Sequence, residues 1–189
     1  MKHTGIIIFF LPLLLAGCGK EQADISDVFG PLNIPENTVS ADGQSTVKVS
    51  VKLSGKTSTD RKSVIFSTSA GAFTVSGTKE QKVIAEFENG EIIARATLRA
   101  PFSPGEITVS VKPEFDSPVK EFTVSGVITA VASNPESIKL EPSASGIGSN
   151  FINEIWLNGF VKNKDNKNVS SGVKVLFEDE LLSGTPAGG

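Results

Sequence analysis

Apolar and polar residues alternate along most of this chain, and the alternation predicts β-strands. Between Thr46 and Leu53, valine and leucine side chains fall on one face, while lysine and serine side chains fall on the other. A period of two with β-branched residues is typical of a half-buried strand. No stretch beyond residue 17 shows a sustained helical period, so we predict an all-β fold. The pattern recurs in four further runs: Val83, Ala85 and Phe87; Ile92, Ala94, Ala96 and Leu98; Ile107, Val109 and Val111; and Phe122 and Val124.

Turn-forming residues separate these runs. Asn89-Gly90 lies between two alternating runs and gives the strongest hairpin signal in the sequence. Asp42-Gly43, Ser54-Gly55 and Ser103-Pro104-Gly105 mark other turns. Short strands with turns every ~8–12 residues indicate an immunoglobulin-like β-sandwich, in which two sheets bury their apolar faces against each other.

One more strand is expected at residues 64–71, with Val64 and Phe66 pointing inward. Each strand presents a single apolar side, and these sides are expected to meet in one core between the two sheets. We therefore predict a shared core for the following side chains: Val47, Val49, Val51, Phe66, Phe87, Leu98, Val109 and Phe122.

The chain is expected to contain two units of this kind. The first immunoglobulin-like domain is predicted at residues 32–126. After it, Val127, Ile128 and Val131 are too apolar for a free linker. We expect them to form a strand end that runs into the second unit and restricts the angle between the two.

The second unit is predicted at residues 127–189. Apolar residues at 138–140, 155–161 and 173–177 predict an opening strand and the first two strands of a sandwich core. After Phe177 the sequence offers acidic residues and a Gly/Pro-rich stretch, without the pattern of later strands. We therefore expect a truncated immunoglobulin-like domain, whose apolar faces lack an opposing sheet.

The first 17 residues have the layout of a secretory signal peptide. A basic start is followed by the apolar run 6–16, and small residues precede Cys18. A membrane-spanning helix needs about 20 apolar residues, and this run is shorter and contains Pro12. Residues 18–31 are predicted to be a tether, which Gly30-Pro31 interrupts before the first periodic segment.

Leu15, Ala16, Gly17 and Cys18 resemble the lipobox of bacterial lipoproteins. The resemblance implies that Cys18 is acylated, that the signal is cleaved before it, and that Cys18 becomes a lipidated N-terminus. In enterobacterial lipoproteins an aspartate after this cysteine favours retention at the inner membrane. Gly19 stands there in this chain, so the resemblance implies a cell-envelope protein held at the outer membrane rather than the inner one.

Four segments of the first domain resemble bacterial Ig-like domains of the invasin/intimin type. They are residues 40–49, 64–73, 94–98 and 104–109, and together they span nearly the whole domain. Residues 53–55 depart from the pattern, since the family often has an aspartate-containing turn there. The resemblance implies a lipid-anchored envelope protein that displays tandem Ig-like domains, with a structural, adhesion or spacer role.

The amino-acid composition limits the partners and the kinds of catalytic or metal site that the chain can have. Removal of Lys2 with the signal leaves 17 of the 18 basic residues against 21 acidic residues, a net charge of −4. This mild acidity argues against a nucleic-acid partner. His3, the only histidine, leaves with the signal, and lipidation would occupy Cys18, the only cysteine. Catalytic sites that need histidine or a thiol, and metal sites that need either, are thereby excluded, and we expect neither an enzyme nor a cofactor.

Carboxylates at 178–180 and Asp165 in a polar loop raise two other hypotheses, a calcium site and a glycosidase pair of acids. The ligand spacing of an EF-hand is absent and nothing marks two acids as partners, so solvated loops are the preferred interpretation. We expect no metal.

Trp156 and Phe160 are candidate surface-contact residues. If Ile155, Leu157 and Val161 face a core, both aromatic side chains point to the opposite face of the strand. Such side chains stack on sugars or dock a protein partner, whose identity the sequence leaves unknown. The alternative is that they pack against the domain junction or the later strands. An alternative function is a non-catalytic, polysaccharide-binding front end of a longer envelope hydrolase.

Overall fold

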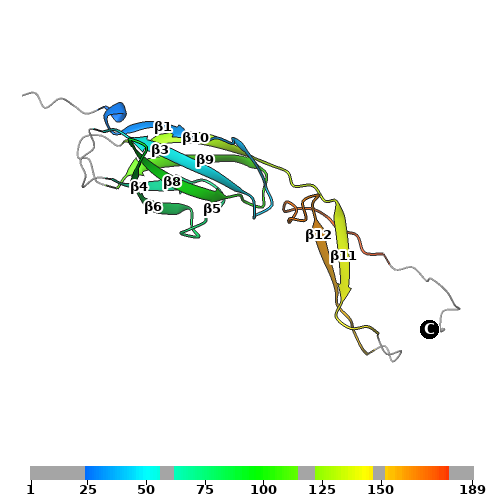
Figure 1. Ribbon diagram of the computed structural model, residues 1–189. Helices are drawn as coiled ribbons and strands as arrows, with labels where there is room; N and C mark the ends of the chain where they lie inside the picture. The colour runs from blue at the N-terminus through cyan, green and yellow to red at the C-terminus, as the bar shows by residue number, and fades with distance from the viewer. Residues whose placement is uncertain (1–23, 56–61, 115–121, 147–151, 179–189) are drawn as a thin grey trace, which may run out of the picture.

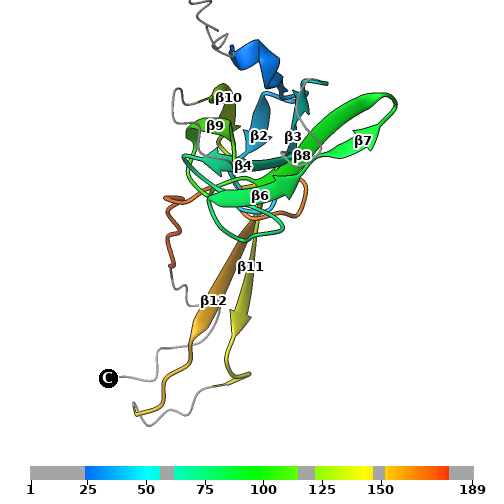
Figure 2. The same cartoon turned by 90° about the vertical axis from the view of Figure 1, so that its left-hand side faces the viewer.

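The computed structural model describes residues 24–55, 62–114, 122–146 and 152–178. These residues form a nearly all-β molecule, in which a sandwich of two sheets continues into a narrow two-stranded extension (Figure 1). Seen from the side, the extension projects from one end of the sandwich (Figure 2). The predicted all-β sandwich is confirmed. Among the described residues, no helix has the length and apolar character needed to cross a membrane.

The sandwich consists of two five-stranded sheets. The first contains β1 (Phe29–Asn33), β3 (Thr46–Leu53), β8 (Glu91–Arg99) and β5 (Ala72–Phe73) in this order, with β7 (Glu86–Glu88) also paired to β8. The second contains, in order, β2 (Thr38–Ser40), β10 (Val124–Val131), β9 (Gly105–Pro113), β4 (Ser63–Thr68) and β6 (Glu80–Ile84). A single turn of 3-10 helix, η1 (Ile25–Asp27), precedes β1, and the Asp24 side chain caps it.

The core lies between these sheets, on the faces that the alternation predicts. Phe66 is fully buried, and its ring packs edge-on against Phe73 with the ring centres 6.1 Å apart. Val64 and Phe66 both point inward, as predicted. Seven of the eight predicted core residues are confirmed as buried: Val47, Val49, Val51, Phe66, Leu98, Val109 and Phe122.

The prediction for Phe87 is wrong, because this side chain is 72% exposed. The run 83–87 reads as one strand in the sequence but is two strands in different sheets. β6 pairs with β4 in the second sheet, while β7 pairs with β8 in the first. The chain crosses between the sheets at the buried Ala85, and Phe87 therefore lies at an outer edge.

The predicted tether is wrong from Asp24 onward. Val28 and Phe29 are buried in the core, and Phe29 is paired with Leu53 at the end of β1. Gly30-Pro31 does not interrupt the strand, since both residues belong to β1. Proline is tolerated at this position because β1 is an edge strand, where a missing N–H breaks no inner ladder.

The predicted boundary at residue 126 is also wrong, because β10 continues to Val131. Ile128 and Ala130 are buried in the core of the sandwich, so this segment completes the first unit instead of connecting two units. Its outward side chains explain the apolar sequence: Val127 and Val131 are exposed on the other face of the same strand.

The N-terminal segment contributes to both sheets. After β1 the chain passes Pro35 and enters the second sheet as β2, which runs parallel to β10 with Thr38 opposite Thr129. Ile34 fills the passage, where its Cδ1 lies 2.6 Å from the place that a Cβ on Gly126 would occupy. Only glycine at this position lets the connecting segment lie so close to β10.

The hairpin predicted at Asn89-Gly90 is confirmed. The two residues join β7 to β8, with Glu88 opposite Glu91. Both have positive φ angles, 51° for Asn89 and 85° for Gly90, as a two-residue hairpin turn of type I′ requires.

The extension is a two-stranded antiparallel sheet of β11 (Ser137–Pro142) and β12 (Leu157–Lys162). Ile138 lies opposite Val161, and Leu140 lies opposite Gly159. We call residues 137–146 and 152–178 the second unit, and residues 132–136 form the segment that leads to it from β10. The strand predicted at 173–177 is not formed, since these residues have no ladder; instead, the Phe177 ring lies over Gly159, 3.2 Å from the position of an added Cβ.

Candidate functional site

Buried polar side chains join the second unit to the sandwich. Ser133 and Ser170 form the centre of this contact: the Ser133 amide donates to the Ser170 hydroxyl at 2.8 Å, and the Ser170 amide donates to the Ser133 carbonyl at 3.0 Å. The Ser170 hydroxyl in turn donates to the carbonyl of Ala41, in the loop between β2 and β3, at 2.8 Å. Both serines are almost fully buried. We call this network the junction.

Asn163 shapes the turn that presents Ser170. Its side-chain oxygen accepts hydrogen bonds from the amides of Asp165 and Lys167, both at 2.9 Å. Its side-chain nitrogen donates to the Ser133 hydroxyl at 2.9 Å, and that hydroxyl donates to the Asn168 carbonyl. One buried amide therefore holds its own turn and ties that turn to the segment leaving the sandwich.

On the sandwich side, Asp42 organises the facing loop. Its carboxylate accepts from the amides of Gln44 and Ser45, at 2.8 and 2.6 Å, and from the Ser45 hydroxyl at 2.7 Å. Burial alone would raise the pKa of Asp42. The two Ser45 hydrogen bonds, the Gln44 amide and the nearby charge of Lys167 outweigh burial and hold the pKa below its ordinary value of 3.8.

Lys167 connects the two sides directly. Its ammonium donates to the Ser45 hydroxyl at 3.0 Å, across 122 positions of sequence. Because Ser45 donates to Asp42, the lysine reaches the buried carboxylate through one hydroxyl. The second unit thereby contributes a positive charge to an acidic loop of the sandwich.

A third contact involves the loop between β8 and β9. The Ser171 amide donates to the Phe102 carbonyl at 2.8 Å, and the Ser171 and Ser103 hydroxyls are 3.0 Å apart. The Phe102 ring lies against Gly43, 2.3 Å from where a Cβ would be. Gly43 has a φ of 69°, so both the backbone and the ring require glycine there.

The junction fixes how the second unit is oriented on the sandwich. The sequence predicts a restricted angle but assigns it to Val127, Ile128 and Val131, and that assignment is wrong. Ile128 belongs to the core of the sandwich, and the other two side chains are exposed. The second unit is held instead by hydrogen bonds to the segment after β10 and to two loops of the sandwich, of which those of Ser133 and Ser170 are buried.

Trp156 and Phe160 lie on the second unit, and both are exposed, by 72% and 47%. Phe160 is opposite Lys139 in the ladder, and the Trp156 backbone is bonded to Ser143 at 2.8 and 2.9 Å. A hollow of about 340 Å³ adjoins the Phe160 ring, with Lys139, Glu141 and Lys162 among its lining residues. An aromatic surface beside charged groups is a chemically suitable contact for a sugar or a peptide.

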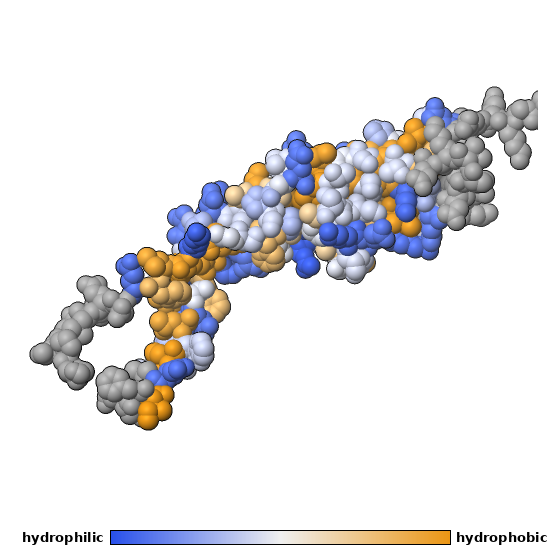
Figure 3. Space-filling view, turned by 180° about the vertical axis from the view of Figure 1, so that it is seen from behind, coloured by the Kyte–Doolittle hydropathy of each residue, from blue (hydrophilic) through white to orange (hydrophobic). Residues whose placement is uncertain are grey.

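The other face of the same hairpin is apolar. Ile138, Leu140 and Leu157 on this face are each about half exposed. The space-filling view shows orange patches on the second unit, whereas blue is frequent on the sandwich (Figure 3). The Phe177 ring covers this face at Gly159, and the side chains around it stay about half exposed.

The remaining predicted sites lie wholly or partly outside the residues that the structure describes. Leu15, Ala16, Gly17 and Cys18, and with them the predicted lipid anchor, lie outside the described residues. Of the acidic run 178–180, the structure describes only Glu178, which is exposed. In the part of the chain that the structure describes, no three histidine, cysteine, aspartate or glutamate side chains gather closely enough to hold a metal ion.

Comparison with protein-family models and with curated proteins found no match to this chain.

Proposed function

We propose that this chain is a lipid-anchored protein of the bacterial cell envelope that displays tandem Ig-like domains in a structural, adhesion or spacer role. The proposal combines the lipobox-like sequence ending at Cys18 with the sandwich and its projecting second unit. In this role the protein carries out no reaction; it holds a surface at a set distance and direction from the membrane.

Strand order supports the Ig-like part of the proposal. In the immunoglobulin fold the first, second, fifth and fourth strands form one sheet, and the third, sixth and seventh form the other. The order β1-β3-β8-β5 in one sheet and β10-β9-β4 in the other parallels that arrangement. β2 and β6 extend the second sheet at its two edges.

The observation that carries the spacer role is the junction. A flexible chain of domains transmits neither distance nor direction, whereas a buried hydrogen-bond network between two units does both. Ser133, on the segment that leaves β10, is bonded to Ser170 of the second unit, and Ser170 is also bonded to Ala41 of the sandwich. The second unit consequently continues from one end of the sandwich at a set angle (Figure 1).

A distance measurement tests this role. Spin labels at Glu106 on β9 and Asn158 on β12, both exposed, are introduced by cysteine substitution in a Cys18→Ser background. We expect a narrow distance distribution, which the double variant S133A/S170A broadens markedly. The matched control is S110A/S125A, two serines that face each other across β9 and β10 within the sandwich. A broad distribution in the otherwise unaltered chain would contradict the spacer role.

The exposed Trp156 and Phe160 favour a second candidate function, that of a polysaccharide-binding accessory unit of an envelope hydrolase. Binding of neutral glucans to the full chain, measured by affinity electrophoresis, should then be lost in W156A/F160A. The matched control is V173A/L176A, two exposed apolar residues elsewhere on the second unit. Unchanged mobility of the unaltered chain in every glucan would reject this function.

A further inference from the structure

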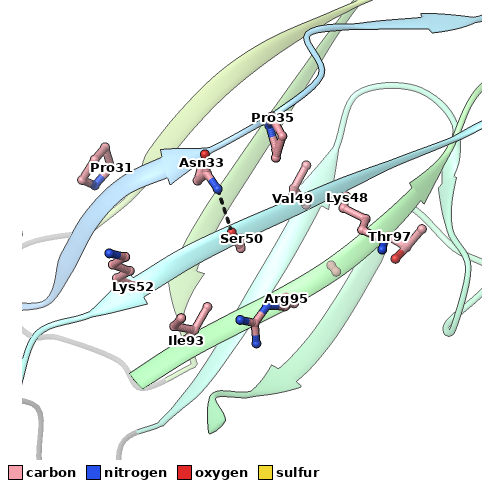
Figure 4. Close-up of a pocket in the computed structure, with 11 residues that line it drawn as sticks. Pro31, Asn33, Pro35, Lys48, Val49, Ser50, Lys52, Ile93, Arg95 and Thr97 are labelled. Atoms are coloured by element: carbon pink, nitrogen blue, oxygen red, sulfur yellow. Dashed lines mark hydrogen bonds between the residues drawn. The ribbon is translucent and has the colours of Figure 1, made fainter. Parts of the chain in front are cut away.

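A groove on the outer face of the sandwich holds three of its cationic side chains. It lies over β1, β3 and β8, encloses about 790 Å³, and includes Lys48, Lys52 and Arg95 in its lining. Figure 4 shows Lys48 and Lys52 on β3 and Arg95 on the neighbouring β8, with Pro31 and Pro35 on the β1 side of the groove. We call this surface the basic groove.

The ladder register sets the spacing of the cations. Lys48 and Lys52 are four residues apart on β3, so they lie about 13 Å apart along the strand. Arg95 lies opposite Ser50, midway between them on the neighbouring strand. Asn33 is opposite Ser50 on the other side and donates to its hydroxyl at 3.4 Å. An anion that meets all three cations must therefore be extended along the groove, as a polymer is and a small ion is not.

Two of the cations have carboxylate neighbours at the rim. Lys52 is 2.7 Å from Glu91, and Arg95 is 2.5 Å from Glu88. All four side chains are about half exposed, and exposed ion pairs contribute little to stability, so a ligand carboxylate can replace either partner. Among the described residues no ion pair is found for Lys48. The groove keeps an excess of positive charge in a chain whose net charge is −3.

We propose that the basic groove binds an acidic polysaccharide, a sugar chain with carboxylates spaced along it. The guanidinium of Arg95 matches the fork of a carboxylate, and the two lysines supply point charges on either side. Asn33, Ser50 and Thr97 line the groove with amide and hydroxyl groups that exchange hydrogen bonds with sugar hydroxyls.

The same lining disfavours single-stranded nucleic acid. Proteins that bind such strands stack the bases on aromatic side chains, and the lining residues of the groove include none. The groove also lies on the sandwich, apart from Trp156 and Phe160 on the second unit. Binding in the basic groove therefore requires neither the lipid anchor nor the spacer role.

Binding of a size-defined oligogalacturonate to the full chain in detergent solution, measured by calorimetry, tests the proposal. We expect binding at low salt that weakens steadily as sodium chloride is added, because added ions screen exposed charges. The triple variant K48A/K52A/R95A should bind at least about tenfold more weakly, since all three charge contacts are lost.

A matched variant controls for overall charge. K79A/K82A/K112A removes the same number of positive charges at or near β6 and β9 of the opposite sheet and should keep the affinity within about twofold. The proposal is overturned if the unaltered chain does not bind oligogalacturonate, or if both triple variants lose the same affinity. It is also overturned if oligo(dT) of equal charge binds as tightly as the sugar.

Discussion

At the scale of single residues, the core side chains and the serines of the junction are buried for different reasons. Alternation identifies the inward side chains of long strands, because one face must leave water. The residues of the junction follow no such pattern. Ser133 and Ser170 lie in loops, and a loop serine is usually solvated. They become buried only because two loops far apart in the sequence pack together, and local sequence patterns do not predict that contact.

The core prediction is tested by one pair of substitutions. Phe66→Ala removes a fully buried ring that packs on Phe73 and should cost about 3–5 kcal/mol of unfolding free energy. Lys48→Ala removes an exposed side chain on β3 and should change the melting temperature little. Thermal unfolding followed by circular dichroism measures both. If both substitutions lowered the stability equally, the assignment of Phe66 to the buried face of β4 and of Lys48 to the exposed face of β3 would be wrong.

Asp42 should make the stability of the sandwich depend on pH. Its pKa is lower in the folded protein than its ordinary value of 3.8, so its stabilising effect is complete well above that value. The effect is lost as the pH falls through the folded pKa. Asp42→Asn should cost about 1–3 kcal/mol at pH 7, because the amide is a weaker and partly mismatched acceptor.

Urea unfolding at about pH 7, 5 and 3 measures this effect. The unaltered protein should lose more stability between the two lower pH values than Asp42→Asn does. Asp165→Asn, at an exposed position of the second unit, is the control and should follow the unaltered protein. Parallel curves for all three proteins would show that Asp42 is not the responsible group.

At the scale of elements, strands were predictable where the alternation was long and both ends carried turn residues. β3, β8 and β9 satisfy both conditions. The single strand predicted at 83–87 was wrong because the chain changes sheet within it, and this change does not interrupt the alternation of apolar and polar residues. β1 was missed since its five residues include glycine and proline, which usually mark a turn. Apolar and polar residues alternate at 173–177, but no ladder forms there. Alternation shows that a segment is amphipathic and does not show whether it pairs with another strand.

The hairpin between β7 and β8 provides a test at this scale. Gly90 has a φ of 85° and no heavy atom near the position of a Cβ, so Gly90→Ala changes only the backbone preference. A non-glycine residue in this region costs about 1–2 kcal/mol. Gly55→Ala is the control: it also has open space, and its φ lies outside the left-handed range.

Urea unfolding should therefore show a loss for Gly90→Ala and no loss, or a small gain, for Gly55→Ala. A similar result for the two variants would argue against the type I′ turn.

At the scale of the whole molecule, the sequence predicts the kind of fold and the presence of a second unit, but not how the two are joined. Hydrophobic patterning is local, whereas the junction brings together loops up to 129 positions apart. The basic groove is of the same kind: its cations come from two strands and become neighbours only through the register of β3 and β8.

The proposed anchor is tested on the whole chain in a bacterial host. Metabolic labelling with a fatty acid should label the unaltered protein, and the Cys18→Ser variant should remain unprocessed and unlabelled. Thr4→Ser, a mild change within the same signal segment, controls for expression and export. Label on the Cys18→Ser variant would reject acylation at this cysteine.

The parallel pairing of β2 with β10 has a mechanical consequence. Once β1 has come away from β3 and the junction has opened, tension between the two ends of the chain pulls β2 from its N-terminal end and β10 from its C-terminal end. Because the two strands run in the same direction, this force acts along both strands and in opposite senses. The bonds that join them, including Thr129 amide to Asn37 carbonyl at 2.7 Å and Ala41 amide to Val131 carbonyl at 2.8 Å, are loaded together in shear. They must then break together instead of opening one by one, so the sandwich resists stretching between its two ends.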